Sequence, residues 1–442
     1  MRSPLGGLIA RPWFDRVTLR FLSKRYFPLS RLWAAAGIAD GSVERFAEAV
    51  PLAGLTPALT ERLRQPLADV ARRRDAALGA DRRWQDAAFG SASDDLAAAD
   101  SARREAAHLY MASRAKFGFL LGRCAVPAVR YDVLDPEAMA ARYGALLDDP
   151  GAAYAAPEAP VIDESRRVPV DGGDEYWIRF AAPSDVMGDT VHARVFEPDG
   201  PADPPTLIFC HGLGVEAEQW RSFHDELVPL RRRGVRLLRF EAPWHGRRTP
   251  AGSYGGERFL AGAPASTLEL LSAQVREAAV AIAWCRRSSA GPVALGGVSL
   301  GALVAQMAGV RARDWPAAMR PDALALVTSC DRMEEVAFHG SLSRALGLPD
   351  ALGAAGWTVE AMARWRPVID PVGAPVVAPE NIVALLGTAD TVTPFALGRA
   401  LFARWGVPEA NLFIRRRGHF SAAIGQLHDW RHLDRLAEVL GR

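Results

Sequence analysis

The fold is decided by residues 292–301, Pro-Val-Ala-Leu-Gly-Gly-Val-Ser-Leu-Gly. A short apolar run leads into Gly297-Val298-Ser299-Leu300-Gly301, and an alanine-rich helical pattern follows. The pattern predicts a strand, a sharp turn and a helix, with Ser299 at the apex of the turn. A residue on so tight a turn lies in strained backbone, and glycines at 297 and 301 let the strand and the helix approach closely. Ser299 is therefore the candidate nucleophile, and an ordinary glycine-rich turn is the alternative.

Two later strands are followed by the residues that a serine nucleophile requires. Residues 381–386 form a buried-strand pattern that opens into a loop carrying Asp390. Residues 411–414 form the pattern of a final strand, and His419 follows it. The chain order Ser, Asp, His makes Asp390 the candidate acid and His419 the candidate base.

An earlier strand pattern, residues 206–210, runs into His211-Gly212-Leu213-Gly214. Backbone N–H groups at such a turn can stabilise the oxyanion of a tetrahedral intermediate. We expect Leu213 and Leu300 to supply the two N–H groups, because Leu300 directly follows the nucleophile.

These four features, in this order, resemble the alpha/beta hydrolase superfamily, and the resemblance covers about residues 170–442. It implies an α/β fold with a mostly parallel, doubly wound sheet and a Ser-His-Asp catalytic triad. Some members of the superfamily place the acid one strand earlier, which makes Asp331 a rival, but the loop around Asp390 favours Asp390. A serine at the apex of this strand-to-helix turn, called the nucleophile elbow, argues against the dehalogenase and epoxide-hydrolase branches, which resemble this fold but use a carboxylate at that position.

The turn of residues 241–248, Glu-Ala-Pro-Trp-His-Gly-Arg-Arg, is expected to border the active site, as the corresponding turn does in the superfamily. Four residues are candidates for the substrate pocket: His211, Trp244, His245 and Arg247. A bidentate arginine would suit a substrate carboxylate or phosphate. The alternative is that the turn caps the following loop. The turn is also similar to that of abhydrolase-domain proteins that carry a helical N-terminal extension.

The patterning divides the chain into three parts. Residues 1–148 are predicted to be helical, residues 149–172 to be a linker rich in Pro and Gly, and residues 173–442 to form the hydrolase domain. An apolar stretch at about 332–378 is too long for a plain connection and predicts a helical cap over the site. The other expected elements are helices at 58–76, 83–89, 94–121, 136–147, 217–232, 267–287 and 429–440, and strands at 176–180, 190–196, 235–240 and 323–328.

Composition limits the classes of partner and compartment. With 53 basic and 51 acidic residues the net charge is +2, so nothing in the overall charge favours nucleic acid. The four cysteines show no paired or metal-ligand spacing, and no dinucleotide-binding loop is present, so we expect no metal and no cofactor. No apolar run approaches the length of a membrane-spanning helix, which predicts a cytoplasmic protein. The scarcity of lysine indicates a GC-rich bacterial genome.

Residues 11–35 mix aromatic side chains with Arg and Lys and contain one acid, Asp15. Such a segment can lie on an anionic membrane surface as a peripheral contact. The alternative, a helix packed on its own hydrolase domain, is the one that we favour.

The sequence therefore predicts a serine hydrolase that cleaves a carboxylic ester of a small-molecule acyl substrate through an acyl-enzyme intermediate. An acyltransferase, a thioesterase or an amidase would carry the same triad. A membrane-lipid hydrolase and a non-catalytic scaffold protein on the same fold are further alternatives, although a scaffold needs none of Ser299, Asp390 and His419 in register.

Overall fold

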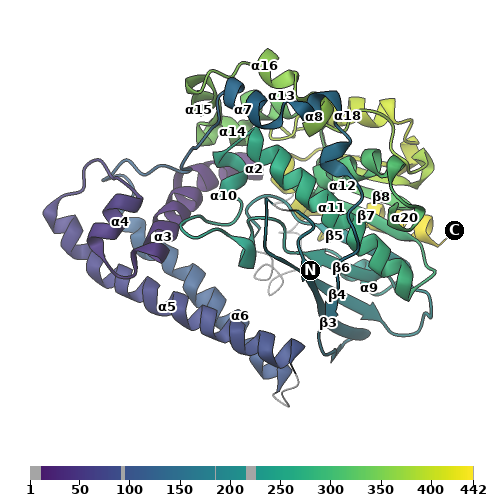
Figure 1. Cartoon of the computed structure of the whole chain (residues 1–442), viewed down its shortest axis with the longest axis horizontal. Helices are drawn as coiled ribbons and strands as arrows, with labels where there is room; N and C mark the ends of the chain where they lie inside the picture. Colours follow the sequence, from purple (N-terminus) through teal and green to yellow (C-terminus); the bar gives the residue numbers. More distant parts are fainter. Residues whose placement is uncertain (1–10, 91–94, 185, 216–224, 442) are drawn as a thin grey trace.

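The computed structural model describes residues 11–90, 95–184, 186–215 and 225–441 (Figure 1). A ten-stranded sheet has the order β1-β3-β4-β6-β5-β7-β8-β9-β10, with β2 paired to β3. Strands β5 to β10 run parallel, and β1 to β4 add an antiparallel edge. The strands are β1 (Asp163–Glu164), β2 (Val168–Val170), β3 (Gly173–Ala181), β4 (Thr190–Pro198), β5 (Thr206–Cys210), β6 (Arg236–Phe240), β7 (Val293–Val298), β8 (Ala323–Val327), β9 (Ile382–Gly387) and β10 (Leu412–Arg415).

Helices precede the sheet and cover both of its faces. The α-helices are α2 (Pro12–Phe21), α3 (Phe27–Ala39), α4 (Val43–Ala49), α5 (Pro57–Phe89), α6 (Leu96–Ala112), α7 (Pro136–Tyr143), α8 (Ala145–Asp148), α9 (Val228–Arg231), α10 (Glu257–Ala261), α11 (Ala265–Ser288), α12 (Leu300–Arg311), α13 (Met333–His339), α14 (Ser341–Leu346), α15 (Leu348–Ala354), α16 (Val359–Ala363), α17 (Arg366–Ile369), α18 (Phe395–Arg404), α19 (His419–Gly425) and α20 (Arg431–Leu440). A π-helical turn, η1 (Leu22–Tyr26), joins α2 to α3, and a 3-10 segment, η2 (Ser113–Leu120), follows α6.

The period-2 alternation along each strand divides the core between the two faces of the sheet. In β5, Ile208 and Cys210 join the larger apolar cluster under α11 and α12, whereas Leu207 and Phe209 join a second cluster under α9 and α20. Both faces of β5 are buried, as expected for a central parallel strand covered by crossover helices. The structure thus confirms the predicted α/β fold with a mostly parallel sheet.

Two predicted boundaries differ from the structure. The stretch 149–172 contains β1 and β2, which pair with β3 at the antiparallel edge. Pro169 is accommodated in β2 because an edge strand can lack one N–H donor. Composition pointed to a linker since short edge strands carry no buried apolar pattern.

The two helical patterns at 58–76 and 83–89 form one helix, α5, of 33 residues. Gly79 interrupts the pattern, at a cost of about 1 kcal/mol relative to alanine. Packing of α5 against α6 offsets that cost, and together they form the hairpin that extends away from the sheet in Figure 1. Of the predicted helix at 217–232, residues 217–224 lie outside the described part of the chain, and α9 is the helix within the remainder.

The stretch 332–378 contains five short helices, α13 to α17, inserted between β8 and β9. Most of the apolar side chains that suggested a cap are buried here, including Trp357 and Trp365. The indole N–H of Trp357 donates to the carbonyl oxygen of Leu134 at 2.7 Å, so the insertion packs on the N-terminal region.

A buried ion pair joins helix α3, in the N-terminal region, to the sheet domain. Arg31 donates to a carboxylate oxygen of Glu257 at 2.6 Å and to the carbonyl oxygen of Gly252 at 2.7 Å. The side chains of Arg31 and Glu257 are 1 % and 2 % exposed. Glu257 also accepts from the backbone N–H groups of Arg130 and Tyr254, so its charge is held by several donors.

We expect Arg31→Met to lower the free energy of unfolding by about 3–5 kcal/mol, because it leaves the buried carboxylate of Glu257 without its cation. Urea denaturation followed by circular dichroism measures the change. Arg64→Met is the matched control, since the Arg64–Glu61 pair is 63 % and 73 % exposed and its loss should cost about 1 kcal/mol or less. Equal losses in the two variants would contradict the prediction.

Candidate active site

Ser299 lies between β7 and α12 with φ 56° and ψ −118°, a backbone conformation that is strained for a residue with a side chain. The turn is tight because both glycines face the end of β5. A Cβ atom on Gly297 would lie 2.5 Å from the carbonyl oxygen of Cys210, and one on Gly301 would lie 2.0 Å from the same atom. The structure therefore gives the physical reason for both glycines of the pentapeptide.

The three residues predicted for the triad lie together. The hydroxyl oxygen of Ser299 is 2.9 Å from Nε2 of His419, and Nδ1 of His419 is 2.8 Å from a carboxylate oxygen of Asp390. His419 is the first residue of α19, and Asp390 lies in the loop after β9. Both are 6 % exposed, so water is largely excluded from the ion pair that would form when His419 takes a proton.

The carboxylate of Asp390 is held by its own loop. Oδ1 accepts from the N–H groups of Val392 at 2.9 Å and Thr393 at 3.0 Å. Oδ2 lies 2.9 Å from the hydroxyl of Thr393, which is also 3.1 Å from Nδ1 of His419. Sequence reasoning missed Thr393. The signal was present, because a threonine three residues after a loop aspartate is placed to bind its carboxylate.

The rival acid has a different partner. Asp331 follows β8 and forms an ion pair with Arg404 of α18. The carboxylate that is hydrogen-bonded to His419 is that of Asp390, the residue favoured from its loop.

The two amides expected at the oxyanion site belong to segments that border the nucleophile. Leu300 is the first residue of α12. Gly212, next to Leu213, packs so closely on the nucleophile that a Cβ atom added to it would lie 3.5 Å from Cβ of Ser299. Within the described part of the chain, neither the Leu213 N–H nor the Leu300 N–H donates to a protein group. Both amides are therefore available for an oxyanion.

His211 and His245, two of the predicted pocket residues, use their ring nitrogens on backbone groups. Nδ1–H of His211 donates to the carbonyl of Gly212, and its Nε2 accepts from Ala242 N–H at 3.2 Å. Nδ1–H of His245 donates to the carbonyl of Pro243, and its Nε2 accepts from Gly214 N–H at 3.1 Å. The two imidazoles join the 211–214 turn to the 241–248 turn, which shapes the candidate oxyanion site.

His245 provides a prediction about pH. Burial, together with the neighbouring imidazole of His211, lowers the pKa of His245 from 6.5 to about 3. Below pH 6.5 the unfolded chain binds a proton that folded His245 does not, so the free energy of unfolding falls as the pH drops towards 3, by up to about 1.4 kcal/mol per pH unit. His245→Gln should show a shallower fall between about pH 7 and about pH 5. The exposed His339→Gln is the control, and an unchanged slope in His245→Gln would contradict the prediction.

The remaining pocket candidates, Trp244 and Arg247, contact other residues of the protein. Trp244 is 8 % exposed and has φ 62°, and its carbonyl accepts from Gly256 N–H. Arg247 forms ion pairs with Asp81 of α5 and with Glu241. Its guanidinium also lies over the rings of Trp84 and Trp177. Two of its three guanidinium nitrogens face carboxylates, whereas Nη2 is buried and has no hydrogen-bond partner among the described residues. A role of Arg247 in the substrate pocket stays a prediction.

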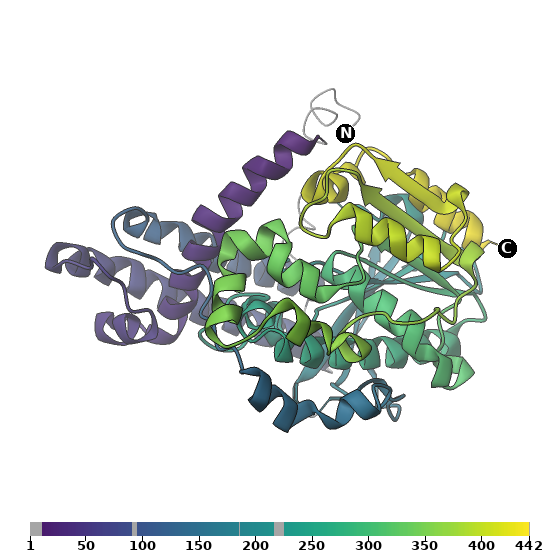
Figure 2. The same ribbon diagram turned by 90° about the horizontal axis from the view of Figure 1, so that it is seen from above.

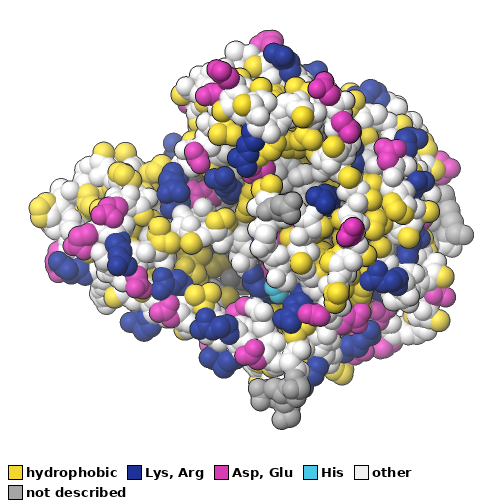
Figure 3. Space-filling model, in the orientation of Figure 1, with side chains coloured by type: hydrophobic (Ala, Val, Ile, Leu, Met, Phe, Trp, Pro, Cys, Tyr) yellow, Lys and Arg dark blue, Asp and Glu magenta, His cyan; other side chains and the backbone are white. Residues whose placement is uncertain are grey.

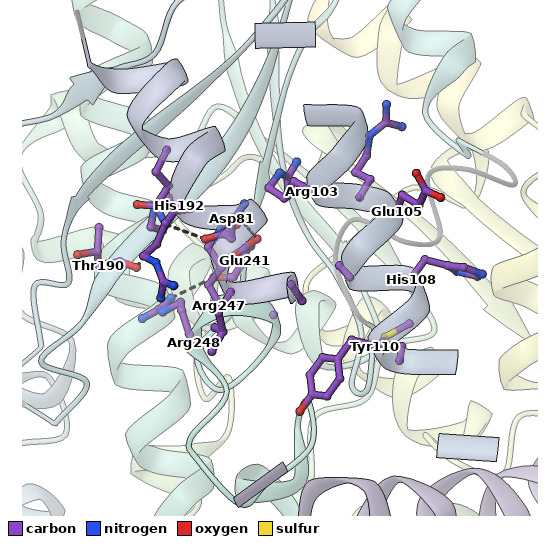
Figure 4. A pocket seen from close by; sticks show the side chains of 18 of the residues that line it. Asp81, Arg103, Glu105, His108, Tyr110, Thr190, His192, Glu241, Arg247 and Arg248 are labelled. Carbon is purple, nitrogen blue, oxygen red and sulfur yellow. Dashed lines mark hydrogen bonds and ion pairs between the residues drawn. The ribbon is translucent and has the colours of Figure 1, made fainter. Parts of the chain in front are cut away.

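Arg247 lies in a cavity of about 880 Å³ between the α5–α6 hairpin and the edge of the sheet (Figure 4). In Figure 3, which has the orientation of Figure 1, this cavity is visible as a hollow in the molecular surface. The cavity is lined by Asp81, Arg103, His192, Glu241 and Arg248, among others, and none of the predicted triad residues lines it. His192 lies on the polar phase of the alternation in β4, with Thr190 and Arg194, and yet it is 5 % exposed. The α5–α6 hairpin covers that face, which sequence periodicity alone could not show.

The N-terminal helix contacts the segment that carries His419, a contact that sequence reasoning missed. Asp15 of α2 accepts from Phe420 N–H at 2.6 Å and from Ser421 N–H at 3.3 Å, and it also binds the Ser421 hydroxyl. A carboxylate at the first turn of a helix compensates the N–H groups that lack a partner there. Asp15 therefore holds the first turn of α19, directly beside His419.

Comparison with known proteins identifies the class. A model of the Alpha/beta hydrolase family matches residues 207–438, a little over half of the chain. The chain belongs to the alpha/beta hydrolase family, which confirms the resemblance found in its motifs. The match includes the segments that carry Ser299, Asp390 and His419.

Solved structures with a similar fold include several esterases. Acetyl xylan esterase 1 from Thermoanaerobacterium sp. is 14% identical, with a TM-score of 0.43 and coverage of 68% of this chain and 97% of that chain. A cold-adapted esterase from an Arctic intertidal metagenomic library is 16% identical, with a TM-score of 0.39 and coverage of 62% and 97%. S-formylglutathione hydrolase from Agrobacterium tumefaciens is 15% identical, with a TM-score of 0.39 and coverage of 62% and 99%. No curated protein sequence matches the chain. These likenesses are too distant to bear on the substrate.

Proposed function

We propose that the protein is a serine hydrolase that cleaves a carboxylic ester through an acyl-enzyme intermediate. The observation that carries the proposal is the unbroken chain of hydrogen bonds from Asp390 through His419 to Ser299, with distances of 2.8 Å and 2.9 Å. A serine hydroxyl is a weak nucleophile unless a base takes its proton, and His419 is within reach to do so.

In the proposed reaction, the Ser299 oxygen attacks the ester carbonyl while His419 Nε2 takes the hydroxyl proton. The Leu213 and Leu300 amides donate to the oxyanion, and Asp390 stabilises the imidazolium and fixes the tautomer with its proton on Nδ1. Collapse of the intermediate expels the alcohol, which receives the proton from His419. Water, activated by the same imidazole, then attacks the acyl-enzyme, releases the carboxylic acid and restores Ser299.

A fluorophosphonate probe tests the proposal directly, because it reacts with a serine whose hydroxyl is activated by a base. We expect the probe to form one adduct, on the peptide that contains Ser299, located by mass spectrometry. His419→Ala should abolish the labelling while Ser101→Ala, at an exposed serine of α6, should not. An unlabelled wild-type protein would contradict the proposal.

A substrate panel then defines the acyl bond. Oxygen esters, thioesters and amides with the same acyl group should be compared at matched concentration, followed by p-nitrophenyl esters of increasing chain length. We expect hydrolysis of the oxygen esters. Turnover confined to an added alcohol or amine acceptor, with no free acid formed, would assign acyl transfer instead.

A further inference from the structure

Helix α2 presents two different faces. Its inner face carries Asp15, which binds the first turn of α19, and the helix also contacts α14. Its outer face carries Trp13, Val17 and Phe21, which are 42 %, 57 % and 53 % exposed. These three residues are four positions apart, so they form one continuous row along the helix. The following helix α3 is mostly buried. The favoured packing on the hydrolase domain therefore applies to α3 and to the inner face of α2, whereas the outer row of α2 faces solvent.

A row of cations runs beside the apolar row. Arg16, Arg20 and Lys24 are also four positions apart, and each is exposed, as is Arg25. None of these four forms an ion pair with any residue that the structure describes. Asp15 is the sole acid of residues 11–39, and its carboxylate is turned inward onto α19. The outer side of α2 therefore carries an apolar row and a basic row, and no acidic side chain.

We propose that α2 docks the protein on the surface of an anionic lipid bilayer. An interfacial helix buries an apolar row that contains Trp and Phe at the level of the headgroups, while adjacent Arg and Lys pair with anionic lipids. Figure 2 shows that α2, in purple, extends along the outside of the molecule, where a flat surface can reach it. A soluble polyanion would pair with the basic row but would leave Val17 and Phe21 in water, which is why the bilayer is the occupant that fits both rows. No helix in the described part of the chain is long and apolar enough to cross a membrane, so the contact is peripheral.

Docking would place the candidate active site next to the bilayer. Asp15 joins α2 to α19, and α19 begins at His419, so the docked helix and the candidate base are neighbours. The inference does not rest on the proposed function, since lipid binding is measured without turnover. Ser299→Ala should bind vesicles as the wild type does, so a failure of the proposed chemistry and a failure of docking give different results.

Vesicle sedimentation of the full-length protein tests the proposal, with phosphatidylcholine alone and phosphatidylcholine mixed with phosphatidylglycerol. We expect the wild type to sediment with the mixed vesicles and the bound fraction to fall as salt is raised. Replacing Arg16, Arg20 and Lys24 together by Gln should lower the partition coefficient on the order of 100-fold. Val17→Gln combined with Phe21→Gln should lower it by at least about tenfold, because two apolar side chains no longer enter the interface.

Matched controls come from exposed positions elsewhere in the chain. Leu78→Gln with Leu109→Gln removes two exposed apolar side chains of α5 and α6, which are 51 % and 44 % exposed. The exposed arginines Arg45, Arg287 and Arg364, replaced together by Gln, match the change in charge. Neither control should alter sedimentation, and circular dichroism checks that every variant is folded.

Three outcomes would overturn the proposal. One is the absence of sedimentation with the mixed vesicles. A second is binding that survives Val17→Gln with Phe21→Gln, which would describe adsorption of a basic surface to any polyanion. The third is a dimer in light scattering that dissociates in this same variant, since the apolar row would then bind a second copy of the chain.

Discussion

Ser299→Ala is expected to lower kcat for an ester substrate by about 10⁶-fold. Without the hydroxyl oxygen no acyl-enzyme forms, and His419 and Asp390 have no proton to transfer, because the three residues act as a unit. The rate that remains should exceed the uncatalysed one by about 10³–10⁴-fold, owing to the oxyanion amides and substrate binding.

Initial rates with a p-nitrophenyl ester measure the change, and active-site titration of the wild type excludes a trace contaminant as the source of activity. The variant should keep its stability, because alanine has no more difficulty than serine at φ 56°. A loss of less than about tenfold would show that the reaction does not pass through Ser299.

Asp390→Asn is expected to lower kcat by about 10⁴-fold with little change in KM. The side-chain amide of asparagine can donate to Nδ1 of His419, which moves the imidazole proton to Nε2. A protonated Nε2 cannot accept the hydroxyl proton of Ser299, although the geometry of the site is unchanged.

Asp331→Asn is the matched control, since Asp331 is 8 % exposed and Asp390 is 6 % exposed. We expect it to retain nearly all activity and to lose about 1 kcal/mol or less of stability, because its partner Arg404 is 55 % exposed. The reverse result, an inactive Asp331→Asn and an active Asp390→Asn, would show that Asp331, after the earlier strand β8, is the acid of the triad.

The two faces of the N-terminal helix connect the candidate active site to the proposed docking surface. Asp15 compensates the first turn of α19, and the apolar row on the other side of α2 is open to solvent. A lipid surface that holds α2 would therefore act next to the segment that positions His419. An acyl substrate drawn from a bilayer would have a short path to Ser299.

The sequence by itself determined the elements whose signals are local. The pentapeptide around Ser299 predicted the elbow, because its two glycines are required by a contact with the end of β5 that any such turn must make. Asp390 and His419 were predicted from their places after two later strands, in the chain order Ser, Asp, His of the alpha/beta hydrolase superfamily. The match to the Alpha/beta hydrolase family confirms the fold that these motifs indicated.

Only the tertiary structure decided which side chains meet across long sequence distances. The contact of Asp15 with Ser421 joins residues 406 positions apart, and the pairing of Arg247 with Asp81 joins residues 166 positions apart. Such contacts depend on how the helical N-terminal region packs on the sheet domain, and no periodicity or spacing encodes that packing. For the same reason the sequence offered Arg247 only as a candidate for the substrate pocket and left Asp15 without a role. Local geometry can be inferred from neighbouring residues, whereas the partner of a charged side chain is set by the packing of the whole chain.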